Sequence, residues 1–287
     1  MDENKEPFSG LPPFLNIDFL KSPGARLIRI LSEYLEPAER LRRARIRDTI
    51  VFFGSARSPS PEDAAERLAQ IKAQISNASS VSEEMTDALG RAESLVRLAR
   101  YYQDAMDLSR RLTEWSKSLT GNHDFVICSG GSGGMMEAAN RGASIAGGKT
   151  IGLNIQLPHE QFVNRFVPRE LVFNFHYFFM RKFWFVYLAK ALVIFPGGFG
   201  TVDEFFEVLT LIQTAKPRKV MPVVLFGTEY WDEVINFDAF VRWGTISPKD
   251  LQIFFKTDSV DEAYQYLTSK LGELYATPEG LDQIKLT

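Results

Sequence analysis

Residues 196–204, which read Pro-Gly-Gly-Phe-Gly-Thr-Val-Asp-Glu, combine groups that could bind a phosphate with an acid beside it. They follow an apolar run at residues 191–195, typical of a buried strand, and they open a run with helical spacing. A glycine turn there directs unpaired backbone N–H groups and the positive end of a helix dipole at one point. We therefore predict that the N–H groups of residues 198–201 converge on a phosphate. The glycines that let the backbone approach it are Gly197, Gly198 and Gly200.

Two side chains belong to the same turn. Thr201 is predicted to cap the helix and to offer a hydroxyl, and Glu204 places a carboxylate beside the site. The helix dipole alone would also favour a carboxylate in the first turn, which is the purely structural alternative for Glu204. A phosphate cradle next to an acid favours chemistry on a nucleotide.

A second glycine turn, residues 129–137, also lies between an apolar run and a helical pattern. It resembles a dinucleotide-binding fingerprint without matching it. The acidic residue expected about twenty positions later is missing, because the next predicted strand ends at Asn154. A nicotinamide-dependent oxidoreductase is therefore disfavoured, and a mononucleotide fits better. The alternative is a turn that is tight only for helix–sheet packing.

Arg181 and Lys182 stand between two strongly apolar stretches, residues 178–180 and 183–185. An arginine among so many apolar side chains needs a partner, because an unpaired buried guanidinium is costly. A phosphate or Glu204 would supply that partner; the alternative is a charged helix face. The end of the first predicted strand adds three candidate nucleotide contacts, Gly54, Ser55 and Arg57.

Other kinds of chemistry find little support. His123, His159 and His176 have no metal-ligand spacing, and no Gly-x-Ser-x-Gly elbow is present, so we expect no metal site and no serine nucleophile. No cofactor is predicted. The single cysteine, Cys128, reads as a core residue; it excludes an internal disulfide and fits a cytoplasmic protein.

Length and composition indicate an ordinary globular protein. The chain has 287 residues, 45% of them hydrophobic, and a net charge of −3, which argues against a large nucleic-acid surface. The longest apolar runs are too short to span a membrane, and residues 2–6 are too charged to begin a secretory signal. We expect neither a nucleic-acid partner nor a membrane partner.

Strands alternate with helices along most of the chain, which predicts a Rossmann-like, doubly wound parallel sheet with helices on both faces. Residues 1–47 read as a partly helical N-terminal extension with two short helices separated at Pro37, and residues 48–287 as a single nucleotide-binding domain. A long helical crossover, residues 62–119, is predicted to project beyond the sheet. The predicted strands are 49–53, 124–128, 149–154, 171–175, 191–195, 219–226 and 252–256.

Three motifs together resemble the LOG family, whose members were long misannotated as lysine decarboxylases. The family hallmark Pro-Gly-Gly-x-Gly-Thr-x-x-Glu matches residues 196–204, and the upstream Arg-Lys matches Arg181 and Lys182 at the expected separation. Residues 129–143 resemble the longer bacterial branch, as does Phe178, which stands where short members have methionine. The resemblance covers roughly residues 48–257 and implies that the loop at 129–137 contacts the nucleotide through Gly131, Gly133 and Met135.

The resemblance also implies an activity. Family members are phosphoribohydrolases, so Arg181 and Glu204 are the expected catalytic residues, and Lys182 and Thr201 join the predicted substrate-binding set. The expected reaction is hydrolysis of the N-glycosidic bond of a purine nucleoside 5'-monophosphate, to free base and ribose 5-phosphate. The alternative is a non-catalytic nucleotide or cofactor carrier on the same fold. LOG relatives are dimers, and the broad apolar surface of residues 83–119 also predicts at least a homodimer.

Overall fold

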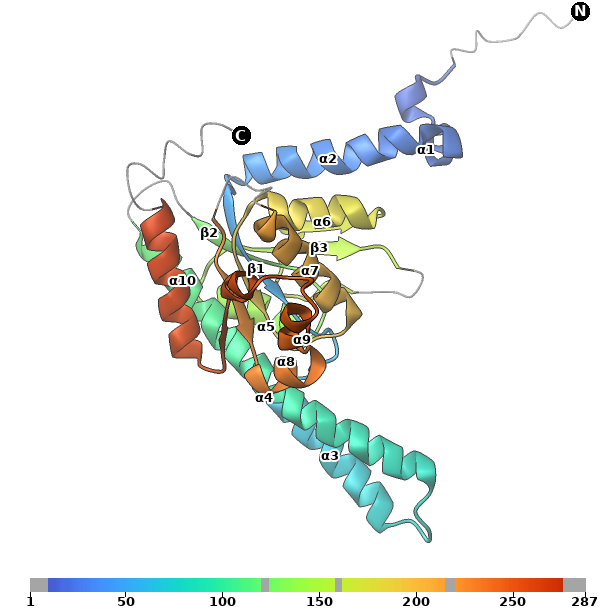
Figure 1. The fold of residues 1–287 in the computed structure, drawn as a ribbon. Coiled ribbons are helices and arrows are strands. Elements are labelled where there is room, and N and C mark those ends of the chain that lie inside the picture. Colours follow the sequence, from blue (N-terminus) through green and yellow to red (C-terminus); the bar gives the residue numbers. More distant parts are fainter. Residues whose placement is uncertain (1–9, 120–123, 158–161, 215–219, 276–287) are drawn as a thin grey trace, which may run out of the picture.

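A seven-stranded, all-parallel sheet forms the centre of the computed structural model, which describes residues 10–119, 124–157, 162–214 and 220–275 (Figure 1). The strand order is β4-β3-β2-β1-β5-β6-β7, so the order reverses between β1 and β5. Such a reversal is the switch point at which doubly wound sheets bind ligands. The strands are β1 Asp48–Phe53, β2 Phe125–Ser129, β3 Thr150–Ile155, β4 Val172–Phe175, β5 Ala189–Ile194, β6 Val223–Phe226 and β7 Phe254–Thr257.

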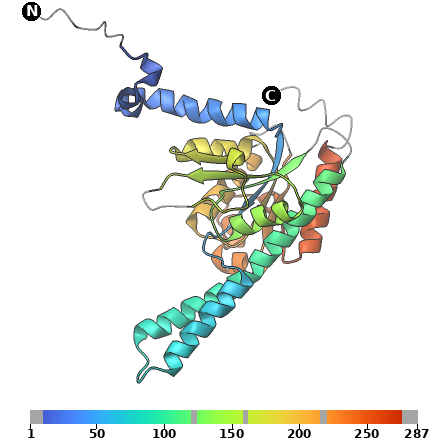
Figure 2. The same cartoon turned by 180° about the vertical axis from the view of Figure 1, so that it is seen from behind.

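Helices cover both faces of the sheet, which confirms the predicted fold class (Figures 1 and 2). Alternate residues of β1 point to opposite faces: Val51 and Phe53 join one core, while Ile50 and Phe52 join the other. The first core includes residues of α2 Arg26–Arg43, α6 Phe178–Tyr187, α7 Phe199–Gln213 and α8 Thr228–Val234. The second includes residues of α4 Glu83–Ser118, α5 Met135–Ile145 and α10 Val260–Tyr275.

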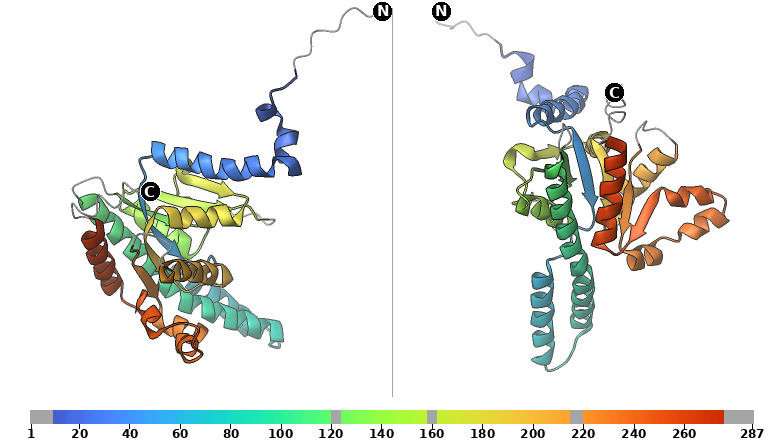
Figure 3. Two further views of the ribbon diagram at one scale, coloured as in Figure 1. Left: turned by 45° about the horizontal axis from the view of Figure 1, so that its top comes forward. Right: turned by 90° about the vertical axis from the view of Figure 1, so that its left-hand side faces the viewer.

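The crossover from β1 to β2 forms a helical hairpin of α3 Pro61–Ser76 and α4 that projects beyond the sheet, as predicted (Figures 1 and 3). At 36 residues, α4 is about 54 Å long. We expected its second apolar side to need the N-terminal helices or another subunit. Instead α3, α5 and α10 pack along it, and Val96 is its only large apolar side chain among the exposed residues that the structure describes. The argument for a dimer from α4 is therefore wrong.

The N-terminal segment forms η1 Pro13–Leu15, α1 Ile17–Lys21, η2 Pro23–Ala25 and the single helix α2, which lies beside α6. We predicted a break at Pro37, but α2 runs through it. A proline leaves the carbonyl four residues earlier, that of Glu33, without its helical donor. The indole Nε1 of Trp184 donates to this carbonyl over 2.9 Å. A tertiary contact thus replaces the lost bond and keeps the helix continuous.

Two short helices, α8 and α9 Phe237–Arg242, lie between the last two strands of the sheet, β6 and β7. Trp231 lies in the core, whereas Trp243 follows the end of α9 and is exposed. The strand predicted at 219–226 is shorter in the structure, because β6 begins at Val223; residue 219 lies outside the described residues. A 3-10 helix, η4 Pro248–Gln252, precedes β7. Among the described helices, none is both long and apolar enough to cross a bilayer.

Candidate active site

Three turns meet at the carboxyl edge of the sheet, beside the switch point. They are the β1 turn (residues 54–57), the glycine loop (residues 130–134) after β2, and the α7 turn (residues 196–200) after β5. The Ser55 N–H donates to the Pro196 carbonyl over 2.9 Å, and the Ser55 carbonyl accepts from the Met135 N–H, also over 2.9 Å. The β1 turn therefore joins the other two through its own backbone, and the predicted site residues from all three are brought together.

Two glycines are required by this close approach. Gly134 has φ +66°, and a Cβ there would lie 2.2 Å from the Ser55 carbonyl oxygen. A Cβ on Gly197 would lie 2.2 Å from the Thr201 hydroxyl oxygen. By contrast, a Cβ on Gly198 or Gly200 would meet nothing within 4 Å in the described chain. Close packing therefore explains why Gly134 and Gly197 are glycines. Gly198 and Gly200 are not needed for packing, and they leave the backbone open to a ligand.

The α7 turn presents unpaired backbone donors at a helix N-terminus. Within the described part of the chain, the N–H groups of Gly198, Phe199 and Gly200 have no hydrogen-bond partner. The Thr201 N–H differs from our expectation, because it donates to the Gly198 carbonyl over 3.0 Å. Gly198, Phe199 and Gly200 are exposed to solvent, and Phe199 is 96% exposed. Three amides, rather than four, can therefore receive an anion here.

Thr201 does not cap α7. The N-cap position is held by Gly198, three residues before Thr201, and has no side-chain cap, so Thr201 lies inside the first turn. Its side chain is buried against Gly197. A residue that the sequence did not identify, Tyr230 of α8, also fixes this turn by donating from its hydroxyl to the Gly197 carbonyl over 2.7 Å.

Glu204 lies one helical turn beyond Gly200 and is only 6% exposed. Its Oε2 atom has no hydrogen-bond partner among the described residues. Burial raises the pKa of this carboxyl group to about 7, against the opposing effect of the nearby positive charges of Arg181 and Lys182. A buried acidic oxygen without a partner is uncommon and needs an explanation. An acid that titrates near neutrality suits proton transfer or the orientation of water.

Arg181 approaches the same edge of the sheet from α6. Its Nε donates to the Leu153 carbonyl over 2.7 Å, and its guanidinium lies over the Phe185 ring, 5.0 Å from the centroid. The guanidinium also approaches the glycine loop, since a Cβ on Gly130 would lie 2.6 Å from its Nη2 atom. Burial lowers the pKa of Arg181 and the charge of Glu204 opposes this, although the two side chains form no direct ion pair.

Lys182, Met135 and Arg57 were also predicted to contact the nucleotide, but the structure gives each of them other surroundings. Lys182 forms ion pairs with Asp203 at 2.7 Å and Glu207 at 3.0 Å, which join α6 to α7. Met135 is buried in the core, where a Cβ on Gly54 would meet its side chain at 2.6 Å. Arg57 is exposed, with its N–H donating to the Ser55 hydroxyl over 3.1 Å. Contact of these residues with a nucleotide stays a prediction.

Asn164 stabilises the glycine loop, and nothing in the sequence pattern identified it. Its side-chain amide donates to the carbonyls of Gly131 and Ser132 over 3.1 and 3.0 Å, and to Asn140 over 2.8 Å. Asn140 in turn accepts from the Ser129 hydroxyl over 2.7 Å. These asparagines hold the shape of the loop from beneath. The one feature of the sequence that could have indicated this support is Asn140, a polar residue at an inward-facing position of a helix.

The remaining candidates for chemistry lie elsewhere. Cys128 is buried in β2, and burial raises the pKa of its thiol. His176 follows β4, and its backbone N–H donates to the Glu33 carboxylate of α2, whereas His123 and His159 fall outside the described residues. Among the residues that the structure describes, no cluster of histidine, cysteine and acidic side chains could hold a metal ion.

The chain is similar to several known proteins. The protein family described as "Possible lysine decarboxylase" matches residues 136–267. Two relatives from Oryza sativa subsp. japonica are named probable cytokinin riboside 5'-monophosphate phosphoribohydrolases. LOGL5 is 29% identical over 66% of this chain and 72% of its own, and LOG4 is 28% identical over 62% and 74%. The solved structure of TM1055 covers 77% of this chain and 99% of its own, with 20% identity and a TM-score of 0.45.

The fold and the three turns define a Rossmann-like α/β protein with unpaired backbone N–H groups at one edge of its sheet. Residues 136–267 match the family model, and the named relatives are LOG proteins, so the chain is similar to the LOG family.

Proposed function

We propose that this chain hydrolyses the N-glycosidic bond of a purine nucleoside 5'-monophosphate, releasing free base and ribose 5-phosphate. The observation that carries the proposal is the position of Glu204, a buried carboxyl with an unpartnered oxygen one helical turn beyond unpaired amides. The names of the plant relatives describe a phosphoribohydrolase acting on a riboside 5'-monophosphate, which supports the same class of reaction.

The 5'-phosphate would bind at the start of α7. The N–H groups of Gly198, Phe199 and Gly200 are free to donate to its oxygens, and the dipole of a 15-residue helix favours negative charge there. The glycine loop, held by Asn164, would face the rest of the nucleotide from the neighbouring strand end. Arg181 lies between β2 and β3 and would neutralise the phosphate or the negative charge that develops on the departing base.

Glu204 would act on the sugar. In its ionised form the carboxylate can orient a water molecule toward C1' and stabilise the positive charge that develops on the ribose, as carboxylates do in other glycoside hydrolyses. The C1'–N bond breaks, and its electron pair leaves with the base. Oxygen from water forms the new bond to C1', and the base takes up one of the two protons of that water. No other reactant is required.

The test is a panel of nucleoside 5'-monophosphates incubated with the purified protein, followed by chromatography of the released bases. We expect free base and ribose 5-phosphate in equal amounts from at least one purine nucleotide, and no release after Glu204→Gln. The exposed Glu233→Gln on α8 is the matched control, because it makes the same chemical change outside the site. Nucleotide binding without base release by the wild-type protein would refute hydrolysis and favour the carrier alternative.

A further inference from the structure

Two basic side chains of α6 lie close to three acidic side chains of α7. The Lys182 ammonium contacts Asp203 Oδ2 at 2.7 Å and Glu207 Oε2 at 3.0 Å. These two acids stand one position before and three positions after Glu204, with which Lys182 forms no ion pair. The other basic residue, Arg181, already has a part in the proposed hydrolysis, whereas Lys182 has none.

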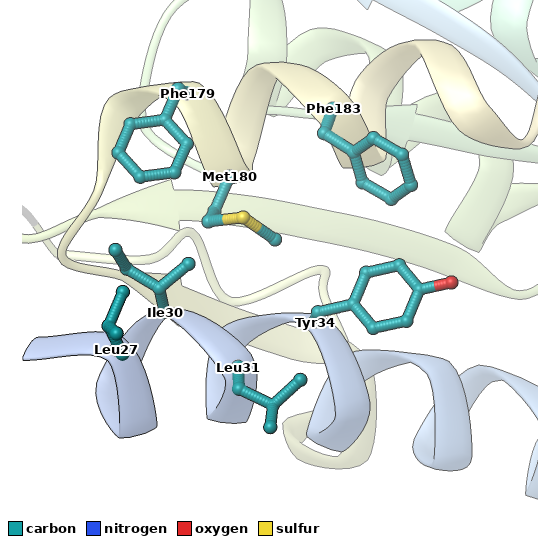
Figure 4. A pocket seen from close by; sticks show the side chains of 7 residues that line it. All are labelled: Leu27, Ile30, Leu31, Tyr34, Phe179, Met180 and Phe183. Atoms are coloured by element: carbon teal, nitrogen blue, oxygen red, sulfur yellow. The ribbon is translucent and has the colours of Figure 1, made fainter.

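The packing of α6 fixes the place of this lysine. Phe179, Met180 and Phe183 face α2 across an apolar groove of about 500 Å³ (Figure 4). Arg181 and Lys182 are directed elsewhere, since Arg181 donates to a carbonyl of β3 and Lys182 reaches α7. Because α6 contacts both α2 and β3, the Lys182 ammonium has a defined position beside α7.

The lysine is shared between two anions and stays charged. Glu207 Oε2 is buried, and a buried carboxylate oxygen needs a compensating charge, which the Lys182 ammonium supplies. The Lys182 side chain is itself only 21% exposed. Burial lowers the pKa of Lys182, but its hydrogen bonds to Asp203 and Glu207 raise that pKa by more. A positive charge is therefore held permanently next to α7 at neutral pH.

The protonation of Glu204 responds to all of these charges. Burial is the largest influence and raises the pKa of Glu204 to about 7. The positive charges of Arg181 and Lys182 on α6 lower this pKa, whereas the negative charges of Glu207 and Asp203 on α7 raise it. Without Lys182, two anions would stand beside Glu204 with no cation between them, and Glu204 would hold its proton to a higher pH.

We propose that Lys182, held between Asp203 and Glu207, is a positioning residue that keeps Glu204 ionised near neutral pH and does not contact the nucleotide. The proposal rests on the proposed hydrolysis, in which ionised Glu204 is the active form. An ammonium group has three hydrogens to donate, and two of them are engaged by carboxylates here. The unpaired amides of the α7 turn, by contrast, are free to receive the phosphate.

The first experiment measures kcat/KM against pH on the best nucleotide from the panel. Lys182→Met should move the rise of this profile about one pH unit higher, because the anions beside Glu204 lose their cation. At pH 7 the value of kcat/KM should fall about fivefold, and it should recover by about pH 9. Glu207→Gln, which removes one of the anions, should move the rise to lower pH.

Two further variants separate the charge of Lys182 from its packing. Lys182→Arg keeps the positive charge and should keep the wild-type profile. Lys256→Met is the matched control, because Lys256 forms a comparable ion pair with Asp232 that joins β7 to α8. This control should leave the rise of the profile where it is in wild type. A lysine that only joins two helices would lower stability on removal without moving the profile along the pH axis.

The second experiment follows Glu204 without any turnover. Urea unfolding over a range of pH gives the stability difference between glutamate and glutamine at position 204, and the pH above which this difference stops changing is the pKa of folded Glu204. We expect this pH to rise by about one unit in the Lys182→Met background and to fall in the Glu207→Gln background.

The two experiments distinguish the possible failures. The proposal is overturned if neither Lys182→Met nor Glu207→Gln moves the pKa of Glu204, or if both move it in the same direction. A higher KM for Lys182→Met with an unmoved pH profile would also overturn it, since Lys182 would then bind the nucleotide. Absence of base release by the wild-type protein would refute the hydrolysis, and the unfolding experiment would still decide the role of Lys182.

Discussion

Replacing Glu204 with glutamine should remove catalysis and, at high pH, stabilise the fold. Burial raises the pKa of this carboxyl from 4.5 to about 7. Between these values the folded protein binds a proton that the unfolded chain has released, so the free energy of unfolding falls as pH rises from about 4.5 to 7. At about 1.4 kcal/mol for each pKa unit, ionised Glu204 destabilises the protein by about 3 kcal/mol above pH 7.

Glutamine has nearly the same shape and carries no charge. The difference in unfolding free energy between Glu204→Gln and wild type should therefore shift in favour of the variant by about 3 kcal/mol between pH 5 and pH 8.5. Comparing two pH values cancels any constant effect of exchanging oxygen for an amide nitrogen. Urea unfolding followed by circular dichroism gives both free energies.

A control variant and an activity assay separate the effect of Glu204 on stability from its effect on catalysis. Glu233→Gln makes the same chemical change at an exposed position and is measured at the same two pH values as the control. The Glu204→Gln variant should lose at least about 100-fold in kcat while its nucleotide affinity stays within about tenfold of wild type. A pH-independent stability difference for Glu204→Gln would refute the raised pKa. Near-normal hydrolysis by this variant would refute the catalytic role.

Further outcomes follow from the same geometry. In wild-type protein, kcat/KM should fall about tenfold for each pH unit below about 7, because the ionised carboxylate of Glu204 is the active form; a flat profile of kcat/KM between pH 5 and 7 would exclude this. Arg181→Ala should raise KM and lower kcat, in contrast to Glu204→Gln, as steady-state kinetics on the best nucleotide will measure. Gly198→Ala should unfold like wild type yet bind inorganic phosphate more weakly, whereas Gly134→Ala should be destabilised by more than about 1 kcal/mol in urea, because of its positive φ and the nearby carbonyl. Tyr230→Phe should cost about 1 kcal/mol and raise KM without altering the pH profile, since one hydrogen bond to the α7 turn is lost.

Local patterns in the sequence determined the fold class and the location of the three turns. Apolar runs closed by glycine predict parallel strands, and the strand bounds found lie within a few residues of those predicted, apart from β6. Turns that follow parallel strands must lie at one edge of the sheet, so the predicted grouping of Gly54, Gly131 and Gly197 required no knowledge of side-chain packing. The arginine and the acid were identified by their place in the motifs.

The tertiary structure decided what those patterns leave open. Pro37 should end a helix on local grounds, yet α2 continues because the Trp184 indole, far along the chain, replaces the missing donor. The polar supports of the turns, Asn164 and Tyr230, come from distant segments and follow no spacing rule. The raised pKa of Glu204 depends on how much water the surrounding helices exclude. Periodicity records which side of an element is apolar. Only the packed structure shows which apolar side, here that of α2 and α6, is exposed among the described residues.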